Sequence, residues 1–125
     1  MKKPSRKAAV LKADKYFSLY IREIAKKEYG NCPFCRKEAI VHCFHFFSRS
    51  NYATRWDENN ATGSCAGCKY RMEFAPYPFN KWYADQHGQI ALDELNKKHH
   101  TIAKFSTQDL LDIADKYQKL YEELK

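Results

Sequence analysis

The runs Cys32-Pro33-Phe34-Cys35 and Cys65-Ala66-Gly67-Cys68 place two Cys-x-x-Cys pairs on either side of residues 36–64. A turn of this kind holds two thiolates on the same side at the spacing of tetrahedral ligands, so the four sulfurs can surround one metal ion. Zinc favours four sulfurs and has no redox chemistry, although iron accepts the same ligands. Four protein ligands leave no open position for a substrate, which indicates a structural zinc ion. A redox-active cysteine pair and a metal-free turn are the alternatives.

The rest of the composition limits the classes of protein to which the chain can belong. Five cysteines are an odd number, so Cys43 is left over as a small buried strand residue, and a disulfide framework is disfavoured. The 22 Lys and Arg against 15 Asp and Glu give a net charge of +7. This excess favours polyanions such as nucleic acid, the alternative being a solvated basic surface without a partner. No apolar run approaches the roughly 18 residues that cross a bilayer, and residues 1–12 lack a signal-peptide pattern, so we expect a soluble, intracellular protein without membrane association.

The length of 125 residues fits a single domain of the α+β class. We expect a basic, flexible start at residues 1–12, a helix over 13–30 with Gly30 as its stop, a metal-binding core over 31–75 and a helical tail over 76–125. Within the core, residues 39–47 are rich in Val, Ile and Phe, which predicts the strands of a short hairpin, whereas the polar stretch 51–64 predicts mostly loop.

The later helices are read from their boundaries. A helix is predicted from about Cys65 to Phe74, because Pro76 disfavours helical geometry in the residue before it. Three more helices are expected over 79–87, 89–98 and 106–124. Ser106 followed by Asp109 resembles a capping box, and the last helix carries one apolar stripe. The stripe consists of Leu110, Ile113, Ala114, Tyr117, Tyr121 and Leu124.

The segment between the cysteine pairs carries the residues of catalytic interest. His45 lies on a predicted strand between Phe44 and Phe46, and Asn60 follows in the predicted loop. A strand histidine, a loop asparagine and a helix opening at a cysteine pair follow the order found in ββα-metal nucleases. A histidine so placed can activate water, and a hard cation can neutralise charge on a phosphate. The alternative is that His45 is simply a core residue.

The run His45-Phe46-Phe47-Ser48-Arg49, then Ala53-Thr54-Arg55-Trp56-Asp57-Glu58-Asn59-Asn60 and Cys65-Ala66-Gly67-Cys68, resembles the phage NinG (Rap) recombination proteins, a zinc-knuckle branch of the HNH (ββα-metal) endonucleases. The segment from Lys12 to Arg22 and the tail from Trp82 to Leu95 are similar to that family as well. The resemblance implies a small zinc-braced ββα-metal (HNH-like) core between an N-terminal helix and C-terminal helices. It also implies cleavage of branched DNA, such as Holliday junctions, during phage recombination.

In the family's pattern His45 matches the general base, Asn60 the middle asparagine, and the four paired cysteines the zinc ligands. Two positions depart from that pattern. Lys69 stands where the family usually has an Asn or His ligand for the catalytic metal, and an ammonium has no lone pair to offer Mg²⁺ or Mn²⁺. Phe44 stands where Asp or Gly is usual. The substitute ligands that we consider for the catalytic metal are His42, Asp57 and Glu73.

Two main hypotheses follow. The first is a divalent-metal-dependent endonuclease of the HNH class, and the second is a catalytically degenerate, zinc-braced DNA-binding module; an interaction role unrelated to DNA is a third. In either of the first two, a cluster of cationic side chains is expected to contact the DNA backbone: Arg49, Arg55, Lys69 and Arg71. Solvated surface charges are the alternative. A homodimer is left open, and the location implied by a phage origin is the cytoplasm of a bacterial host.

Overall fold

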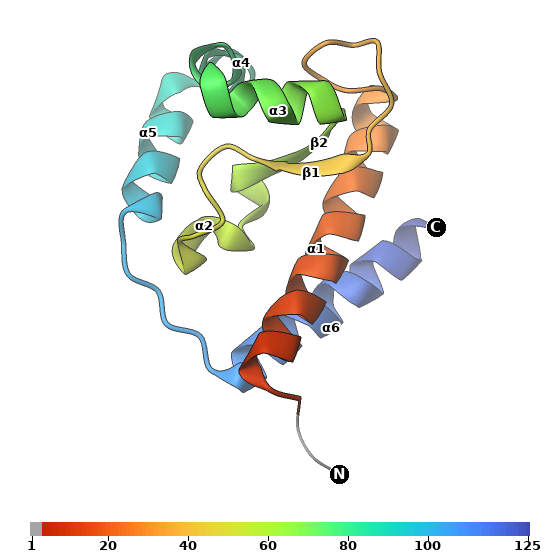
Figure 1. Ribbon diagram of the computed structural model, residues 1–125, viewed down its shortest axis with the longest axis vertical. Coiled ribbons are helices and arrows are strands. Elements are labelled where there is room, and N and C mark those ends of the chain that lie inside the picture. Colours follow the sequence, from red (N-terminus) through yellow and green to blue (C-terminus); the bar gives the residue numbers. More distant parts are fainter. Residues whose placement is uncertain (1–3) are drawn as a thin grey trace.

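The computed structural model describes residues 4–125 and combines helices with a small two-stranded sheet (Figure 1). The α+β class predicted from the sequence is confirmed. In chain order the elements are α1 (Arg6–Tyr29), β1 (His42–His45), α2 (Tyr52–Arg55), the 3₁₀ turn η1 (Glu58–Asn60), β2 (Ala61–Ser64), α3 (Ala66–Phe74), α4 (Tyr77–His87), α5 (Gln89–His99) and α6 (Thr107–Leu124).

Helix α1 begins at Arg6, well before the predicted start at residue 13. The Ser5 side chain caps this end by accepting a hydrogen bond from the backbone N–H of Ala8 at 3.1 Å. The first two turns are buried through Ala9 and Ala13, whose small side chains gave no strong apolar signal. Residues 1–3 of the expected flexible start lie outside the described residues. The helix ends before Gly30, as predicted, and this glycine has a φ of 79°.

The first core forms where α1 packs against α6, the two helices that cross in Figure 1. The ring of Phe17 meets that of Tyr117 edge-on at 5.0 Å between centroids. The predicted capping box at Ser106 and Asp109 is present at the start of α6. The buried members of this core are Ala9, Ala13, Phe17, Ile21, Trp56, Leu110, Ala114 and Tyr117.

The sheet differs from the predicted hairpin within residues 39–47, because only β1 lies there. Its antiparallel partner is β2, in the stretch predicted as loop, with His42 opposite Ser64 and His45 opposite Ala61. The sequence Ala-Thr-Gly-Ser of β2 has no large apolar side chain, so it carries no alternating pattern. Gly63 lets β2 lie close against α1, since a Cβ atom there would come within 2.5 Å of Ile40 Cγ2 and 2.8 Å of Ala25 Cβ.

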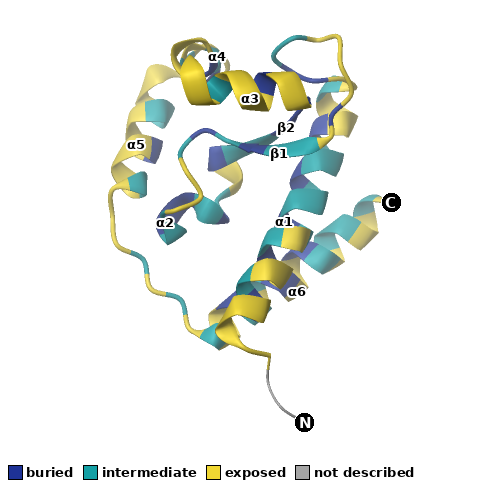
Figure 2. Cartoon of the chain, viewed as in Figure 1, coloured by how far each residue is buried: buried dark blue, intermediate teal, exposed yellow. Residues whose placement is uncertain are grey.

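The second core surrounds the cysteines and is separated from the first by β1. Figure 2 shows buried and half-buried positions along the sheet and the inner side of α1, whereas α3 presents a largely exposed outer side. Helix α4 begins two residues before the predicted Phe79, because Pro78 fits the first turn, where a missing N–H breaks no helical hydrogen bond. The buried members are Cys32, Phe44, Phe46, Cys65, Cys68, Phe79, Tyr83 and Leu95. None of the helices in residues 4–125 is long and apolar enough to span a lipid bilayer.

Candidate metal centre and basic cleft

The two Cys-x-x-Cys pairs come together as the sequence predicts. The sulfur atoms of Cys32, Cys35, Cys65 and Cys68 all lie within 4.8 Å of one another, and none of them forms a disulfide. The Cys35 and Cys65 sulfurs are 3.8 Å apart. A tetrahedron with zinc–sulfur bonds of about 2.3 Å has edges of about 3.8 Å, so the cluster fits a structural zinc ion. Four sulfur ligands would close the coordination sphere, and the site would stabilise the fold without taking part in a reaction.

Local backbone geometry positions the first pair. The Arg36 N–H donates to the Cys32 carbonyl oxygen at 2.8 Å, and the Cys32 N–H donates to the Glu38 carbonyl oxygen at 2.8 Å. Arg36 has a φ of 63°, in the left-handed region that closes the turn. Backbone hydrogen bonds from Glu38 and Lys37 lower the pKa of Cys35 to about 6. The turn therefore prepares a thiolate, which is the form that binds metal.

The second pair lies at the start of α3. Cys65 is the N-cap residue, and its sulfur accepts a hydrogen bond from the Cys68 N–H at 3.3 Å. Burial raises the pKa of both Cys65 and Cys68, and the neighbouring cysteines add to the effect on Cys68. The crowded thiols resist ionising together unless a cation offsets the charge. Arg71 contributes such charge, because its guanidinium donates to the Cys68 sulfur at 2.8 Å. Arg71 therefore lies against the cluster of four cysteines rather than beside His45.

A cleft of about 580 Å³ lies between α1, β1 and α3. His45 lines this cleft, and its Nε2 atom lies 3.0 Å from the Arg55 carbonyl oxygen. A carbonyl oxygen only accepts hydrogen bonds, so Nε2 carries the proton and Nδ1 keeps its lone pair. Burial, with a smaller contribution from the charges of Arg49 and Lys69, lowers the pKa of His45 to about 4. The hydrogen bond to the Arg55 carbonyl oxygen and the charge of Asp14 oppose this decrease. The imidazole is thus neutral near pH 7 and able to accept a proton.

Asn60 is fully buried and does not line the cleft. Its Oδ1 atom accepts from the Phe47 N–H at 2.8 Å, and its Nδ2 atom donates to the carbonyl oxygens of Phe47 at 3.0 Å and Thr54 at 3.1 Å. The Phe46 N–H also donates to the Asn60 carbonyl oxygen at 2.9 Å. One asparagine therefore ties the segment after β1 to the turn at the end of α2. This network fixes the backbone that follows His45 and the end of α2, which carries the Arg55 carbonyl oxygen.

Arg55 is held inside the protein rather than presented to solvent. Its guanidinium forms two hydrogen bonds with the Asp14 carboxylate, at 3.0 and 2.6 Å, and a third with the Arg49 carbonyl oxygen at 3.1 Å. The Trp56 indole N–H donates to the same carboxylate at 3.0 Å. The Arg55 and Asp14 side chains are only 17% and 18% exposed. Arg55, which the sequence placed among the DNA contacts, is thus engaged in a bridge between α1 and α2.

The cleft carries an excess of positive charge. Arg49 and Lys69, both predicted from the sequence, line it together with Arg22 of α1, which the sequence analysis missed. The available signal was a polar stripe at helical spacing, because Asp14, Ser18 and Arg22 follow at intervals of four residues and all line the cleft.

The three proposed substitute ligands for a catalytic metal separate in the structure. His42 and Glu73 line the cleft with His45. Asp57 lies in a different pocket, where its carboxylate accepts from the Asn59 N–H at 2.9 Å and from Lys98 Nζ at 2.6 Å. Phe44 is 1% exposed and packs into the second core. Among the described residues, the four cysteines are the only group of three or more His, Cys, Asp or Glu side chains arranged to hold a metal. The cleft therefore does not fit a preassembled Mg²⁺ or Mn²⁺ site.

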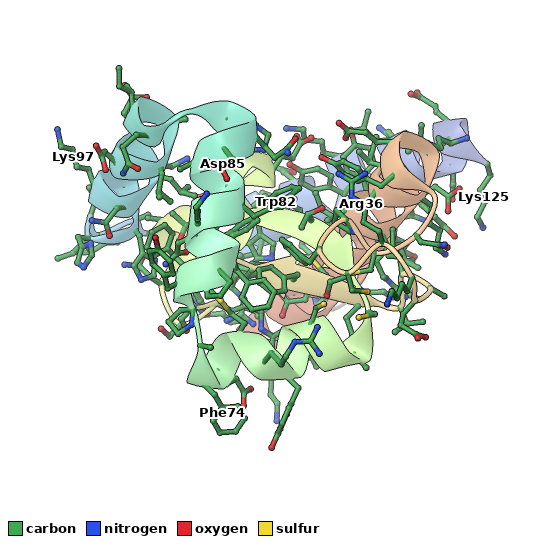
Figure 3. All side chains as sticks on the ribbon, turned by 90° about the horizontal axis from the view of Figure 1, so that it is seen from above. Arg36, Phe74, Trp82, Asp85, Lys97 and Lys125 are labelled. Atoms are coloured by element: carbon green, nitrogen blue, oxygen red, sulfur yellow. The ribbon has the colours of Figure 1, made fainter. Side chains whose placement is uncertain are left out.

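Two aromatic side chains of this region differ in their exposure. Trp56 is 8% exposed and belongs to the first core, whereas Tyr70 is 62% exposed on α3. Its neighbour Phe74 projects into solvent from the end of that helix (Figure 3).

Comparison with known proteins finds no matching family model, curated protein or solved structure. What the arrangement offers chemically is a neutral histidine with a free lone pair, in a cationic cleft beside a cluster of four thiols.

Proposed function

We propose that this protein cleaves DNA and that His45 is its general base, within a zinc-braced ββα-metal (HNH-like) core. The observation that supports the proposal most strongly is the hydrogen bond from His45 Nε2 to the Arg55 carbonyl oxygen, which leaves Nδ1 available in a basic cleft. A general base must be neutral at the working pH and must reach the proton that it removes. Burial keeps His45 neutral, with a pKa of about 4.

In the proposed reaction a water molecule attacks phosphorus and gives one proton to His45 Nδ1. The bond from phosphorus to the leaving sugar oxygen breaks, and that oxygen takes a proton from solvent. Negative charge that develops on the phosphate is stabilised by cationic side chains of the cleft. Asn60 does not touch the substrate in this scheme, since it is buried; its hydrogen bonds to Phe47 and Thr54 hold the backbone around His45.

Branched DNA, such as a Holliday junction, is the proposed substrate class, in line with the resemblance to phage recombination proteins. A homodimer would present two clefts to two strands of one junction, and the expected site of action is the cytoplasm of a bacterial host. The net charge of +7 supports a polyanionic partner.

A second candidate function is a DNA-binding module that has kept the fold without catalysis. Lys69 favours it, because this side chain lines the cleft at the position of the family's metal ligand and cannot bind a cation. Within residues 4–125 no group of three ligands for Mg²⁺ or Mn²⁺ lies beside His45, which favours it as well.

Cleavage of labelled DNA distinguishes the two functions. The wild type is incubated with a branched and a linear duplex, alone and with Mg²⁺ or Mn²⁺, beside His45→Ala and the control His100→Ala. His100 is exposed directly after α5 and does not line the cleft. We expect His45→Ala to reduce the rate by about 10² to 10⁴ while its zinc content and circular dichroism stay unchanged. Wild-type protein that binds but never cuts either DNA would support the binding module, and activity that survives in His45→Ala would exclude this histidine as the base.

A further inference from the structure

Three cationic side chains reach the cleft from three separate segments of the chain. Arg22 comes from the middle of α1, Arg49 from the loop after β1, and Lys69 from the first turn of α3. Burial raises the pKa of the Cys43 thiol in the cleft wall to about 12, and the charges of all three cations oppose that increase. Their electrostatic fields therefore converge on one region of the cleft.

These cations lack acidic partners. Within residues 4–125 none of the three forms a salt bridge, whereas Arg55, Lys81 and Lys98 each do. Two carboxylates line the cleft. Asp14 is engaged by Arg55 and Trp56, which leaves only the exposed Glu73. Three cations near one another repel, so the free protein is left with an electrostatic cost that a bound anion would remove.

The backbone of Lys69 lies next to the cysteine cluster. Its N–H donates to the Cys65 carbonyl oxygen at 3.2 Å, and it directly follows Cys68, so both cysteines of the second pair help to fix the helical turn that carries it. A phosphate bridged by a divalent cation would need oxygen ligands for that ion, and the cleft supplies one free carboxylate. A phosphate bound directly by lysine and arginine needs none.

We propose that the cleft binds a phosphate group of the DNA backbone directly through Lys69, Arg22 and Arg49, with no bridging divalent cation. These side chains supply the positive charge that a metal ion would otherwise bring to the phosphate. The proposal rests on the proposed function in taking DNA as the ligand, but it does not require that the protein cut DNA.

The test is DNA binding measured by fluorescence anisotropy over a series of salt concentrations, with and without Mg²⁺. Divalent cations are removed from the buffer with a resin before protein is added, because EDTA would also attack the cysteine cluster. We expect the wild type to bind at least as tightly without Mg²⁺ as with it. Lys69→Ala should weaken binding and reduce the slope of log K against log salt by about 1, the value for one lost phosphate contact.

The matched control is Lys81→Ala, since Lys81 lies on α4 away from the cleft and already pairs with Asp85 at 2.9 Å. Its salt slope should equal that of the wild type. Inorganic phosphate is a second probe: it should raise the melting temperature of the wild type more than that of Lys69→Ala. Lys69→Asn restores the family's ligand type and should bind weakly under both conditions. Zinc content and circular dichroism verify that each variant is folded.

Three results would overturn the proposal: wild-type binding that requires Mg²⁺, a Lys69→Ala slope equal to the control, or Lys69→Asn that binds tightly once Mg²⁺ is added. These outcomes are separate from the cleavage assay. A protein that binds without divalent cations but never cuts would refute the hydrolysis and keep the phosphate site. A protein that binds and cuts only with Mg²⁺ would refute the phosphate site and keep the hydrolysis.

Discussion

The carbonyl oxygen of Arg55 fixes the tautomer of His45, 3.0 Å from its Nε2 atom, while the guanidinium of the same Arg55 is held by Asp14 on α1. A backbone group thus orients the proposed base, and a salt bridge to a distant helix orients that backbone group. The helices on either side of β1 in the chain, α1 and α2, therefore determine where the lone pair of His45 lies.

Asp14→Asn tests this dependence. The amide keeps the shape of the carboxylate but loses its charge, so the bridge to Arg55 weakens. We expect the free energy of unfolding to fall by roughly 1 to 3 kcal/mol. The NMR signal of the His45 ring should shift. In a DNA cleavage assay, kcat of the variant should fall by a larger factor than KM rises. The control is Asp85→Asn, which removes a pair whose side chains are 58% and 60% exposed and should cost less than about 1 kcal/mol. Equal effects on the His45 signal in both variants would contradict the positioning role.

The pH dependence of His45 follows from its burial. The pKa is lowered from 6.5 to about 4, so the unfolded chain takes up a proton more readily than the folded protein between these values. The contribution of His45 to stability is therefore complete above about pH 6.5 and falls as the pH drops toward 4. An NMR titration of the ring should give a midpoint well below 6.5. The value of kcat/KM for cleavage should not fall between pH 8 and pH 6 through protonation of His45, because the ring stays neutral in that range. A titration midpoint near 6.5 would mean that the ring is solvated.

Metal analysis should find about one zinc ion per chain, because four thiolates at this spacing form a closed site whose binding energy is also folding energy. Cys65→Ser should lose the metal and a large part of the stability of the fold. Thermal unfolding measures this loss. Cys43→Ala is the matched control, since Cys43 is the one cysteine outside the cluster. It should keep the zinc. A well-folded wild type without metal would rule out the zinc site.

Gly63 should tolerate no side chain. A Cβ atom there would lie 2.5 Å from Ile40 Cγ2 and 2.8 Å from Ala25 Cβ, so Gly63→Ala should destabilise the protein by about 1 to 3 kcal/mol as β2 is pushed from α1. In Gly67→Ala the nearest atom is the end of the Arg71 side chain at 3.5 Å. That variant should be neutral or slightly stabilising, because alanine favours a helix over glycine. Chemical denaturation of the two variants measures the difference.

The parts of the molecule that local chemistry determines were predictable from sequence. The cysteine turns, the capping box at Ser106 and the stop at Gly30 each depend on a few adjacent residues, and each is confirmed. β2 was not predictable, because its residues pair with β1 only once α1 provides a surface that Gly63 can approach. The engagement of Arg55 was not predictable for a related reason. Whether an arginine is free or engaged depends on Asp14, which lies 41 residues from Arg55 in the chain.

The division of the interior into two cores gives each its own optical reporter, since the chain has two tryptophans. Trp56 is buried in the core shared by α1 and α6, and Trp82 packs at the cysteine core, stacked on Phe46 at 6.0 Å. With Trp56→Phe, the remaining fluorescence follows the cysteine core; with Trp82→Phe, it follows the core between α1 and α6. Transitions that coincide in the two variants would make the cores one cooperative unit, and transitions that separate would give the order in which they melt.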